Sequence, residues 1–454
     1  MAAILGDIEA DQQPPMTVPL RHFVVALGFL LAGVLFGLGI ALDSVTGFAT
    51  LAHVHLLLAG WICITIMGAM TQFVPVWSGT TLHSRRLASL QLTLVVVGLL
   101  GFVTGLLLNS LVWLIPFGGL MLAGFWTFVY NIGRTMATFD SYDVTERHFL
   151  LSLGFFLVLT LLGFLLATGF TSPIFPELSL SRTAVVAMHA TVAIFGAVLT
   201  TVYGALYQLG TMFTQTELHG FDEYLRRVEE IGHPVGVVLL AVGRLLDAVL
   251  LAQVGGVLVV GAALAFSVIL ARKLYEMQVE WTPMHTRYTV VVPSLTAWAL
   301  LTLPAWIQNP TAPANLFGAP GTVHLFVLGA VGFVVFGTLY HIIPFIIWVH
   351  RYSDLLGYEP VPMIDDLYDG RLAAADGTLL GSGTLLLVAT DWFRFSPTMQ
   401  AIGGALVGLG ILVFGANMLL VIHAHSPHPL SRILLGSLDP RTEPTAPGDP
   451  PVNE

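Results

Sequence analysis

Twelve long apolar runs follow one another along the chain, separated by short polar segments. A helix of about 20 apolar residues spans the hydrocarbon core of a bilayer, and each run is near or above that length. Charged residues make up only 10% of the 454 residues, against about 25% in an average soluble domain. The sequence predicts an all-α membrane protein with twelve transmembrane helices, at residues 21–43, 51–77, 86–108, 111–137, 147–170, 182–213, 231–252, 254–276, 288–308, 321–349, 372–391 and 397–424.

Basic residues in the short loops predict the orientation, because positively charged loops stay on the cytoplasmic side. Loops after odd-numbered runs contain only Arg182 and Arg394. Loops after even-numbered runs contain Arg85, Arg86, Arg134, Arg147, Arg226, Arg227, Arg272, Lys273, Arg287, Arg351 and Arg371. We therefore expect a plasma-membrane protein with both termini in the cytoplasm. Tails at 1–20 and 426–454 would flank one membrane domain at 21–425.

The second, sixth and tenth runs share a sequence template. When His55 is aligned on His324, the matching pairs are Leu56/Leu325, Gly60/Gly329, Gly68/Gly337 and Pro75/Pro344. When His53 is aligned on His189, the matching pairs are Gly60/Gly196, Thr65/Thr201, Gly68/Gly204, Ala69/Ala205 and Gln72/Gln208. The matches predict a threefold internal pseudo-repeat. The alternative is that small residues recur at such spacings in any membrane helix, because they allow close packing.

The predicted topology places four histidines in the outer halves of these three helices: His53, His55, His189 and His324. An imidazole inside a membrane helix is costly without a partner, so such residues indicate a functional site. A metal ion or haem iron is the first partner to consider, with hydrogen-bonded core histidines as the alternative. The single cysteine, Cys63, excludes disulfides within this chain, a cysteine-held iron–sulfur cluster and a thiolate zinc site.

Twelve spans with histidines in the outer halves of spans two, six and ten resemble subunit I of the haem–copper oxidase superfamily, most closely the cytochrome cbb-type branch. The resemblance implies a respiratory oxidoreductase that reduces a small gas, with a quinol or cytochrome as electron donor and accessory subunits as partners. It implies at least one b-type haem, with His55 and His324 as axial ligands and His53 as the alternative on span two. His189 would serve copper.

The ligand pattern departs from that family in two places. The tenth run has a single histidine, His324, where the family has a His-x-His pair. No adjacent histidine pair occurs in the chain, and residues 250–253 read Leu-Leu-Ala-Gln where the family has its two further copper ligands. His233 lies at the inner end of the seventh run. Copper therefore lacks a full ligand set, and we expect poor or no oxygen reduction of the familiar kind.

The second run also resembles another family. Its His-x-His, the glycine after a five-residue spacer and Val-Pro-x-Trp-Ser-Gly at 74–79 are similar to the opening motif of the NnrS proteins, which are haem- and copper-containing membrane proteins of nitric oxide stress. This resemblance implies a non-catalytic haem- or copper-binding role as the alternative function. A secondary transporter is the third interpretation, and histidines in one layer argue against it.

Two histidine centres are expected, because residues two apart on an α-helix point about 200° apart. His55 and His324 are predicted to hold the low-spin haem, and His53 and His189 a second centre in the same layer. Arg182 and Arg394 lie in outer segments from which arginines of oxidase subunits reach haem propionates. Each could equally anchor its helix end at the membrane interface.

Three further polar residues are candidates for a proton route. Arg244 and Asp247 lie three apart, on one predicted face of the seventh run, where an ion pair is either structural or part of proton transfer. His341 aligns with Gln72 and Gln208 and indicates a polar layer nearer the inner side. The net charge of −10 argues against nucleic acid as a partner.

Overall fold

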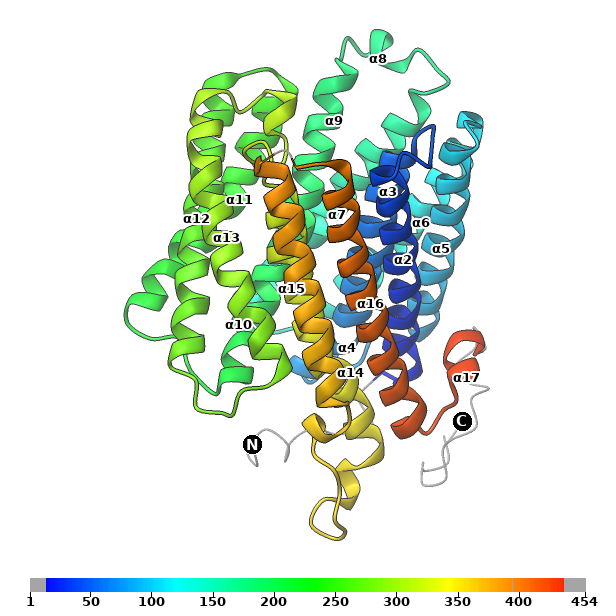
Figure 1. Cartoon of the computed structure of the whole chain (residues 1–454), viewed down its shortest axis with the longest axis vertical. Helices are drawn as coiled ribbons and strands as arrows, with labels where there is room; N and C mark the ends of the chain where they lie inside the picture. The colour runs from blue at the N-terminus through cyan, green and yellow to red at the C-terminus, as the bar shows by residue number, and fades with distance from the viewer. Residues whose placement is uncertain (1–13, 394, 437–454) are drawn as a thin grey trace.

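The computed structural model describes residues 14–393 and 395–436, which form helices and connecting loops with no β-strand. The long helices run side by side along one axis (Figure 1). Eleven helices in this part of the chain are long and apolar enough to cross a membrane: Thr17–Ala41 (α2), Ala49–Trp77, Arg85–Leu107 (α5), Leu111–Met136 (ending in α6, Leu114–Met136), Val144–Thr168 (α7), Arg182–Thr214, Val249–Tyr275 (α12), Pro283–Gln308 (α13), Leu325–Arg351, Gly370–Phe393 (α15) and Pro397–His425 (α16).

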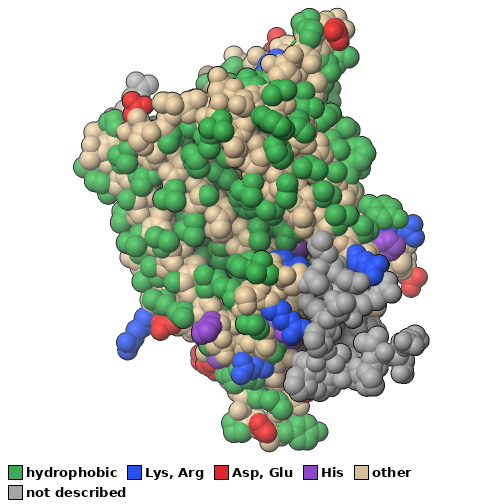
Figure 2. Space-filling view, turned by 90° about the vertical axis from the view of Figure 1, so that its right-hand side faces the viewer, with side chains coloured by type: hydrophobic (Ala, Val, Ile, Leu, Met, Phe, Trp, Pro, Cys, Tyr) green, Lys and Arg blue, Asp and Glu red, His purple; other side chains and the backbone are tan. Residues whose placement is uncertain are grey.

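The surface of the bundle agrees with a multi-pass membrane protein in contact with lipid. Figure 2 shows hydrophobic side chains over the middle of one face, while charged side chains gather toward the two ends. In lipid the backbone polar groups must be satisfied within the protein, and continuous helices achieve this. The ends of the membrane domain differ slightly from the prediction. Residues 17–20, expected in the tail, form the first turn of α2, and Arg21 Nε donates to the carbonyl of Ile433 in the short helix α17 (Leu430–Leu435), 2.5 Å away.

A further long helix, α11 (Phe221–Leu245), is long enough to cross a membrane, but it does not qualify as a span by composition. Its first turns carry most of its charged residues, namely Asp222, Glu223, Arg226, Arg227, Glu229 and Glu230. Its second half packs closely on α12 through glycines, since a Cβ at Gly255 would lie 2.3 Å from the backbone nitrogen of Leu240. The close contact fixes this charged helix to the bundle.

The predicted boundary between the seventh and eighth runs is wrong. The expected helices at 231–252 and 254–276 are α11, ending at Leu245, and α12, beginning at Val249. Asp247 lies in the turn between them with a φ of 50°, a left-handed conformation that Asp tolerates better than most residues. Arg244 and Asp247 therefore do not share one face of a helix, as the sequence had suggested.

A charged cluster closes the end of α12 next to the start of α11. Lys273 Nζ lies 3.0 Å from Asp222 and 2.5 Å from Glu276, and Arg272 lies 2.6 Å from Asp222. The hydrogen bond from Lys273 lowers the pKa of the Glu276 carboxyl. The carboxylates of this end are therefore neutralised by neighbouring cations.

Each of the three template helices contains an eight-residue π-helical segment: Leu56–Cys63 (η2), Val192–Leu199 (η4) and Leu325–Gly332 (η6). η2 separates α3 (Ala49–His55) from α4 (Ile64–Trp77), η4 separates α9 (Arg182–Thr191) from α10 (Thr200–Thr214), and η6 precedes α14 (Phe333–Arg351). All three segments begin and end at matching positions of the sequence template. Such i→i+5 turns are rare and frequently lie at functional sites. Nothing in the apolar sequence had predicted them.

At each of three template glycines, the preceding long helix packs closely against the template helix. A Cβ at Gly68 would lie 2.7 Å from His22 Cβ, one at Gly204 would lie 2.6 Å from His148 Cβ, and one at Gly337 would lie 3.2 Å from Arg287 Cβ. Close packing therefore accounts for the shared glycines. It does not account for the shared histidines.

Candidate functional site

Four histidines at the same end of the template helices form the candidate site. His53 and His55 occupy the last turn of α3, His189 lies in the last turn of α9, and His324 immediately precedes η6. Each histidine therefore stands at or just before the beginning of a π segment. We refer to His53, His55, His189 and His324 as the histidine layer.

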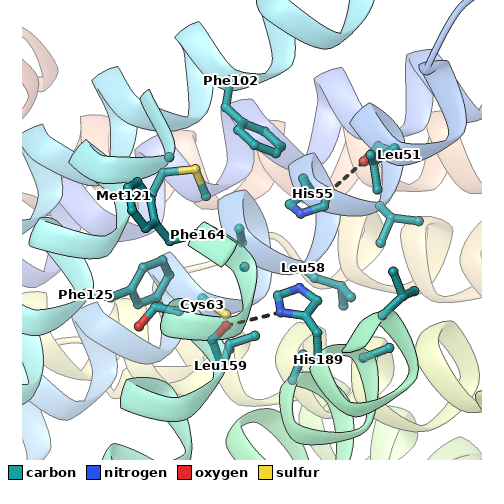
Figure 3. Close-up of a pocket in the computed structure, with 18 of the residues that line it drawn as sticks. Leu51, His55, Leu58, Cys63, Phe102, Met121, Phe125, Leu159, Phe164 and His189 are labelled. Atoms are coloured by element: carbon teal, nitrogen blue, oxygen red, sulfur yellow. Dashed lines mark hydrogen bonds between the residues drawn. The ribbon is translucent and has the colours of Figure 1, made fainter. Parts of the chain in front are cut away.

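His55 and His189 face one cavity of about 500 Å³. Figure 3 shows the two rings pointing into the same space from opposite helices. The walls are almost entirely apolar and include Phe102, Phe125 and Phe164 from α5, α6 and α7. The Phe102 ring lies 5.1 Å from the His55 ring, centroid to centroid. The two imidazoles are the main polar groups in an apolar chamber.

Hydrogen bonds fix the tautomers of both rings. His55 Nδ1 lies 2.8 Å from the carbonyl of Leu51, and His189 Nδ1 lies 3.1 Å from the carbonyl of Leu159 (Figure 3). A carbonyl only accepts, so each Nδ1 carries the proton and each neutral ring keeps a lone pair on Nε2. No described residue makes a hydrogen bond to either Nε2. Metal-binding histidines usually show this arrangement, in which the second nitrogen donates to a carbonyl or carboxylate.

His53 and His324 form a second pair, in which Nδ1 of each ring is also hydrogen-bonded to an oxygen. His53 Nδ1 lies 2.7 Å from the carbonyl of Gly33 in α2, and His324 Nδ1 lies 2.7 Å from Oδ2 of Asp391 in α15. The two histidines are close enough for their charges to interact, as are His55 and His189. Neither His53 nor His324 lines the 500 Å³ cavity. The histidine layer is thus divided into two pairs.

The pairing differs from the principal prediction. His55 was expected opposite His324, and His53 with His189; the structure instead places His55 and His189 on one cavity, which neither His53 nor His324 lines. His53 had been named as the alternative partner of His324 on span two. The 200° separation of His53 and His55 on α3 accounts for the two different neighbours.

Of the two predicted arginines, Arg182 lies apart from the cavity. Arg182 donates from Nη1 to the carbonyl of Leu166 (3.1 Å) and stacks over the Phe170 ring at 4.2 Å, and it is not among the cavity-lining residues. Arg394 lies outside the described residues. Neither residue can therefore be assigned to a cofactor from its position.

Arg244 has a structural role beside the cavity. Its guanidinium donates to the carbonyls of Pro310, Asn315 and Leu316 and to the Thr191 hydroxyl, at 2.7–3.0 Å. Leu316 lines the cavity, so Arg244 fixes the loop that closes it. His341 lies away from the histidine layer, beside a second cavity of about 310 Å³ that His285 also lines.

The described residues of the histidine layer provide no group of three ligands for a copper ion. In the described part of the chain, one group of three His, Cys, Asp or Glu side chains lies within reach of a single ion, and it consists of His219, Asp222 and Glu276. Lys273 already binds both carboxylates of that group. His189 belongs to no such group within the described ranges, and His233 donates from Nε2 to the carbonyl of Phe195 at 2.9 Å.

Two polar partners had not been predicted. Asp391, which binds His324, stands at the end of an apolar run beside Trp392, and its acidic side chain was the available signal. Glu229 is fully buried against His148, which stands at the start of the predicted run at 147–170. The sequence feature that could have indicated Glu229 was an acidic residue one helical turn before His233.

No protein-family model matches the chain, and no curated protein sequence matches it significantly. The functional proposal consequently depends on the chemistry of the histidine layer.

Proposed function

We propose that the protein is a membrane haem protein in which His55 and His189 are the axial ligands of one b-type haem in the 500 Å³ cavity. The observation that carries the proposal is the pair of unbonded Nε2 atoms facing one apolar cavity. The volume lies within the roughly 300–1,000 Å³ of pockets that enclose small molecules and cofactors. Apolar walls suit a porphyrin, and two imidazoles are a complete axial set.

The residues of the chain orient the ligands and exclude water. The carbonyls of Leu51 and Leu159 hold the two rings in the tautomer that presents Nε2. The rings of Phe102, Phe125 and Phe164 cover the sides of the cavity. Haem iron held by two imidazoles supplies electron transfer, because it leaves no coordination position open to a substrate.

The second histidine pair supports a second centre. His53 and His324 each present Nε2 in the same manner, and the Asp391 carboxylate orients the His324 imidazole. We propose that this pair holds a metal or a second haem. His53 and His55 lie two residues apart on α3, so the two centres would be neighbours.

Electron transfer, or reduction of a small gas such as oxygen or nitric oxide, is the function that two adjacent redox centres favour, with a quinol or cytochrome as donor. A haem- or copper-binding role in the response to nitric oxide, as in NnrS proteins, is the second candidate. One observation favours it: among the described residues His189 belongs to no three-ligand group that could hold copper beside a haem.

The topology completes the proposal. We propose that α11 crosses as a twelfth span and that three structural units repeat, each contributing one template helix. The matching π segments and glycine contacts support the repeat. The distribution of basic loops supports cytoplasmic termini in a plasma membrane.

Optical spectra of the purified protein, oxidised and dithionite-reduced, test the proposal. We expect low-spin haem bands that disappear in His55→Ala and in His189→Ala. His341→Ala, which changes a histidine away from the layer, should leave the bands intact. Haem-free protein would refute the proposal, and a spectrum lost in His55→Ala and in His324→Ala but kept in His189→Ala would restore the pairing first predicted from the sequence. Copper analysis and oxygen consumption with a reduced quinol separate the two candidate functions.

A further inference from the structure

A carboxylate is buried inside the bundle, away from the histidine layer. Glu229 of α11 and His148 of α7 have fully buried side chains, and His148 Nε2 lies 3.2 Å from both oxygens of Glu229. The Tyr207 hydroxyl of α10 donates to Oε2 of Glu229 over 2.8 Å. Burying an unpaired carboxylate is very costly, so the imidazole and the phenol are needed to compensate it.

The chain contains a second cluster of the same design. Asp376 of α15 is bound by Arg287 of α13 and by the Tyr340 hydroxyl of α14. Tyr207 and Tyr340 both align on Thr71 of the sequence template. His148 and Arg287 both pack with their Cβ atoms against a template glycine. The two clusters therefore share a carboxylate, a tyrosine and a cationic group, and they differ in whether that group is His or Arg.

This difference decides whether the cluster can exchange a proton. Arg keeps its charge at any physiological pH, so the Arg287–Asp376 pair is permanent. His148 donates from Nδ1 to the carbonyl of Val144 (2.6 Å), which leaves Nε2 facing Glu229. One proton must lie between Nε2 and the carboxylate, either on the acid or on the imidazolium. Without that proton, a lone pair and a carboxylate, both acceptors, would face each other.

A polar surface lies at one end of this pair. Glu230 follows Glu229 on α11, and it binds Arg147 (2.5 Å), which is 44% exposed, and Arg226 (3.1 Å). The charge of Glu230 acts on His148, and the charge of Arg226 acts on Tyr207. On α12, the nearby cations Arg272 and Lys273 are engaged by Asp222. The aqueous end of the cluster is therefore close to a hydrated ion-pair network.

The polar groups continue inward from the pair. His233 lies one turn beyond Glu229 on α11, and its Nε2 donates to the carbonyl of Phe195. Its Nδ1 and the hydroxyl of Tyr203 are buried, and neither has a hydrogen-bond partner in the described part of the chain. The rings of Tyr203 and His233 lie 4.9 Å apart, centroid to centroid. A neutral His233 with a lone pair on Nδ1 can accept a proton.

We propose that His148 and Glu229 form a buried proton-binding site that takes one proton from the surface near Arg147 and passes it toward His233. The shared proton leaves the His148–Glu229 pair and binds Nδ1 of His233, which becomes an imidazolium. The Glu229 carboxylate left behind keeps the hydrogen bond from Tyr207, and a proton from water refills the pair. This proposal goes beyond haem binding and does not depend on it.

Infrared difference spectroscopy of the full-length protein in lipid nanodiscs, taken between acidic and alkaline buffers in H2O and D2O, tests the proposal. We expect a titrating carboxyl and imidazole component that is completely lost in Glu229→Gln and in His148→Asn. Asp376→Asn is the matched control and should leave that component unchanged. The same component in wild type and in both variants would overturn the proposal.

A further variant tests the proposal if Glu229→Gln and His148→Asn do not fold. His148→Arg converts the cluster into the arrangement of Arg287, Tyr340 and Asp376. We expect this variant to fold and to lack the titrating component. A folded His148→Arg protein that titrates like wild type would show that the proton resides elsewhere.

Discussion

Adding one methyl group at Gly163 should disturb the cofactor site more than the stability of the fold. Gly163 lies in α7, and a Cβ there would lie 3.1 Å from Cε1 and 3.6 Å from Nδ1 of His189. Carbon atoms prefer separations of about 3.5–4.0 Å, so the ring must shift by roughly half an ångström. The hydrogen bond from His189 Nδ1 to Leu159 is already 3.1 Å long. Such a shift stretches it to about the 3.5 Å limit of a useful hydrogen bond.

The two energetic effects on folding nearly cancel in Gly163→Ala. Losing the hydrogen bond costs about 0.5–1.5 kcal/mol, and replacing Gly by Ala inside a helix gains about 0.5–1 kcal/mol. Cofactor affinity should fall about 10–100-fold, because the carbonyl that orients the ligand is lost. Reversible unfolding and haem titration of the apoprotein measure the two quantities.

Gly154→Ala is the matched control for this experiment. Gly154 lies in the same helix, and nothing lies within 4 Å of the added Cβ. This variant should be as stable as wild type or more stable by up to about 1 kcal/mol, with unchanged haem affinity. Equal haem affinity in both variants would refute the role of His189 as an oriented ligand.

Three further predictions concern other parts of the molecule. In Gly37→Ala the new Cβ would lie 2.7 Å from Cε1 of His53. The affinity of the second pair for a metal or haem should therefore fall about 10–100-fold, while the spectrum of the first haem stays the same. An unchanged affinity at the second pair would contradict this. Gly255→Ala should destabilise the protein by about 1–3 kcal/mol or more, because the methyl meets the backbone of α11, whereas Gly261→Ala on the open face of α12 should not, as thermal unfolding would show. Because the pKa of Glu276 is lowered in the folded protein, its stabilising effect is present at neutral pH and is lost as the pH falls through that lowered pKa. Glu276→Gln should therefore show a smaller loss of stability on acidification, and an unchanged acid limb would exclude this role.

The depth of the histidine layer could be predicted from the sequence, but the partners could not. Position within an apolar run gives depth, since each helical residue advances about 1.5 Å. The angular separation of His53 and His55 likewise predicted two sites. Which neighbour stands on each side of α3 depends on how the helices are arranged around it. For that reason His55 was assigned to His324, although His189 lies opposite it.

The start of α11 was missed for a different physical reason. Hydropathy placed the helix at 231–252, because Asp222 and Glu229 suggest an aqueous loop. Both carboxylates are buried, and their compensating groups, Lys273 and His148, come from other helices. A buried charge is recognisable only when its partner is known. The turn at Asp247 was hidden as well, because no glycine or proline marks it.

The π segments also alter the relation between the two halves of each template helix. An uninterrupted α-helix returns to the same face after about 18 residues, which is five turns. His189 and Tyr207 are 18 residues apart and would be in phase. η4 lies between them, and each i→i+5 turn takes up about one more residue, a rotation of about 100°. The π segment therefore rotates one half of the helix relative to the other. As a result, the half that carries His189 can face the cavity while the half that carries Tyr207 faces the Glu229 carboxylate. Deleting a single residue from η4 would let the segment close as an ordinary α-helix, and the two halves would keep their relative orientation, because about 17 α-helical residues turn through the same angle as 18 residues that include one π turn.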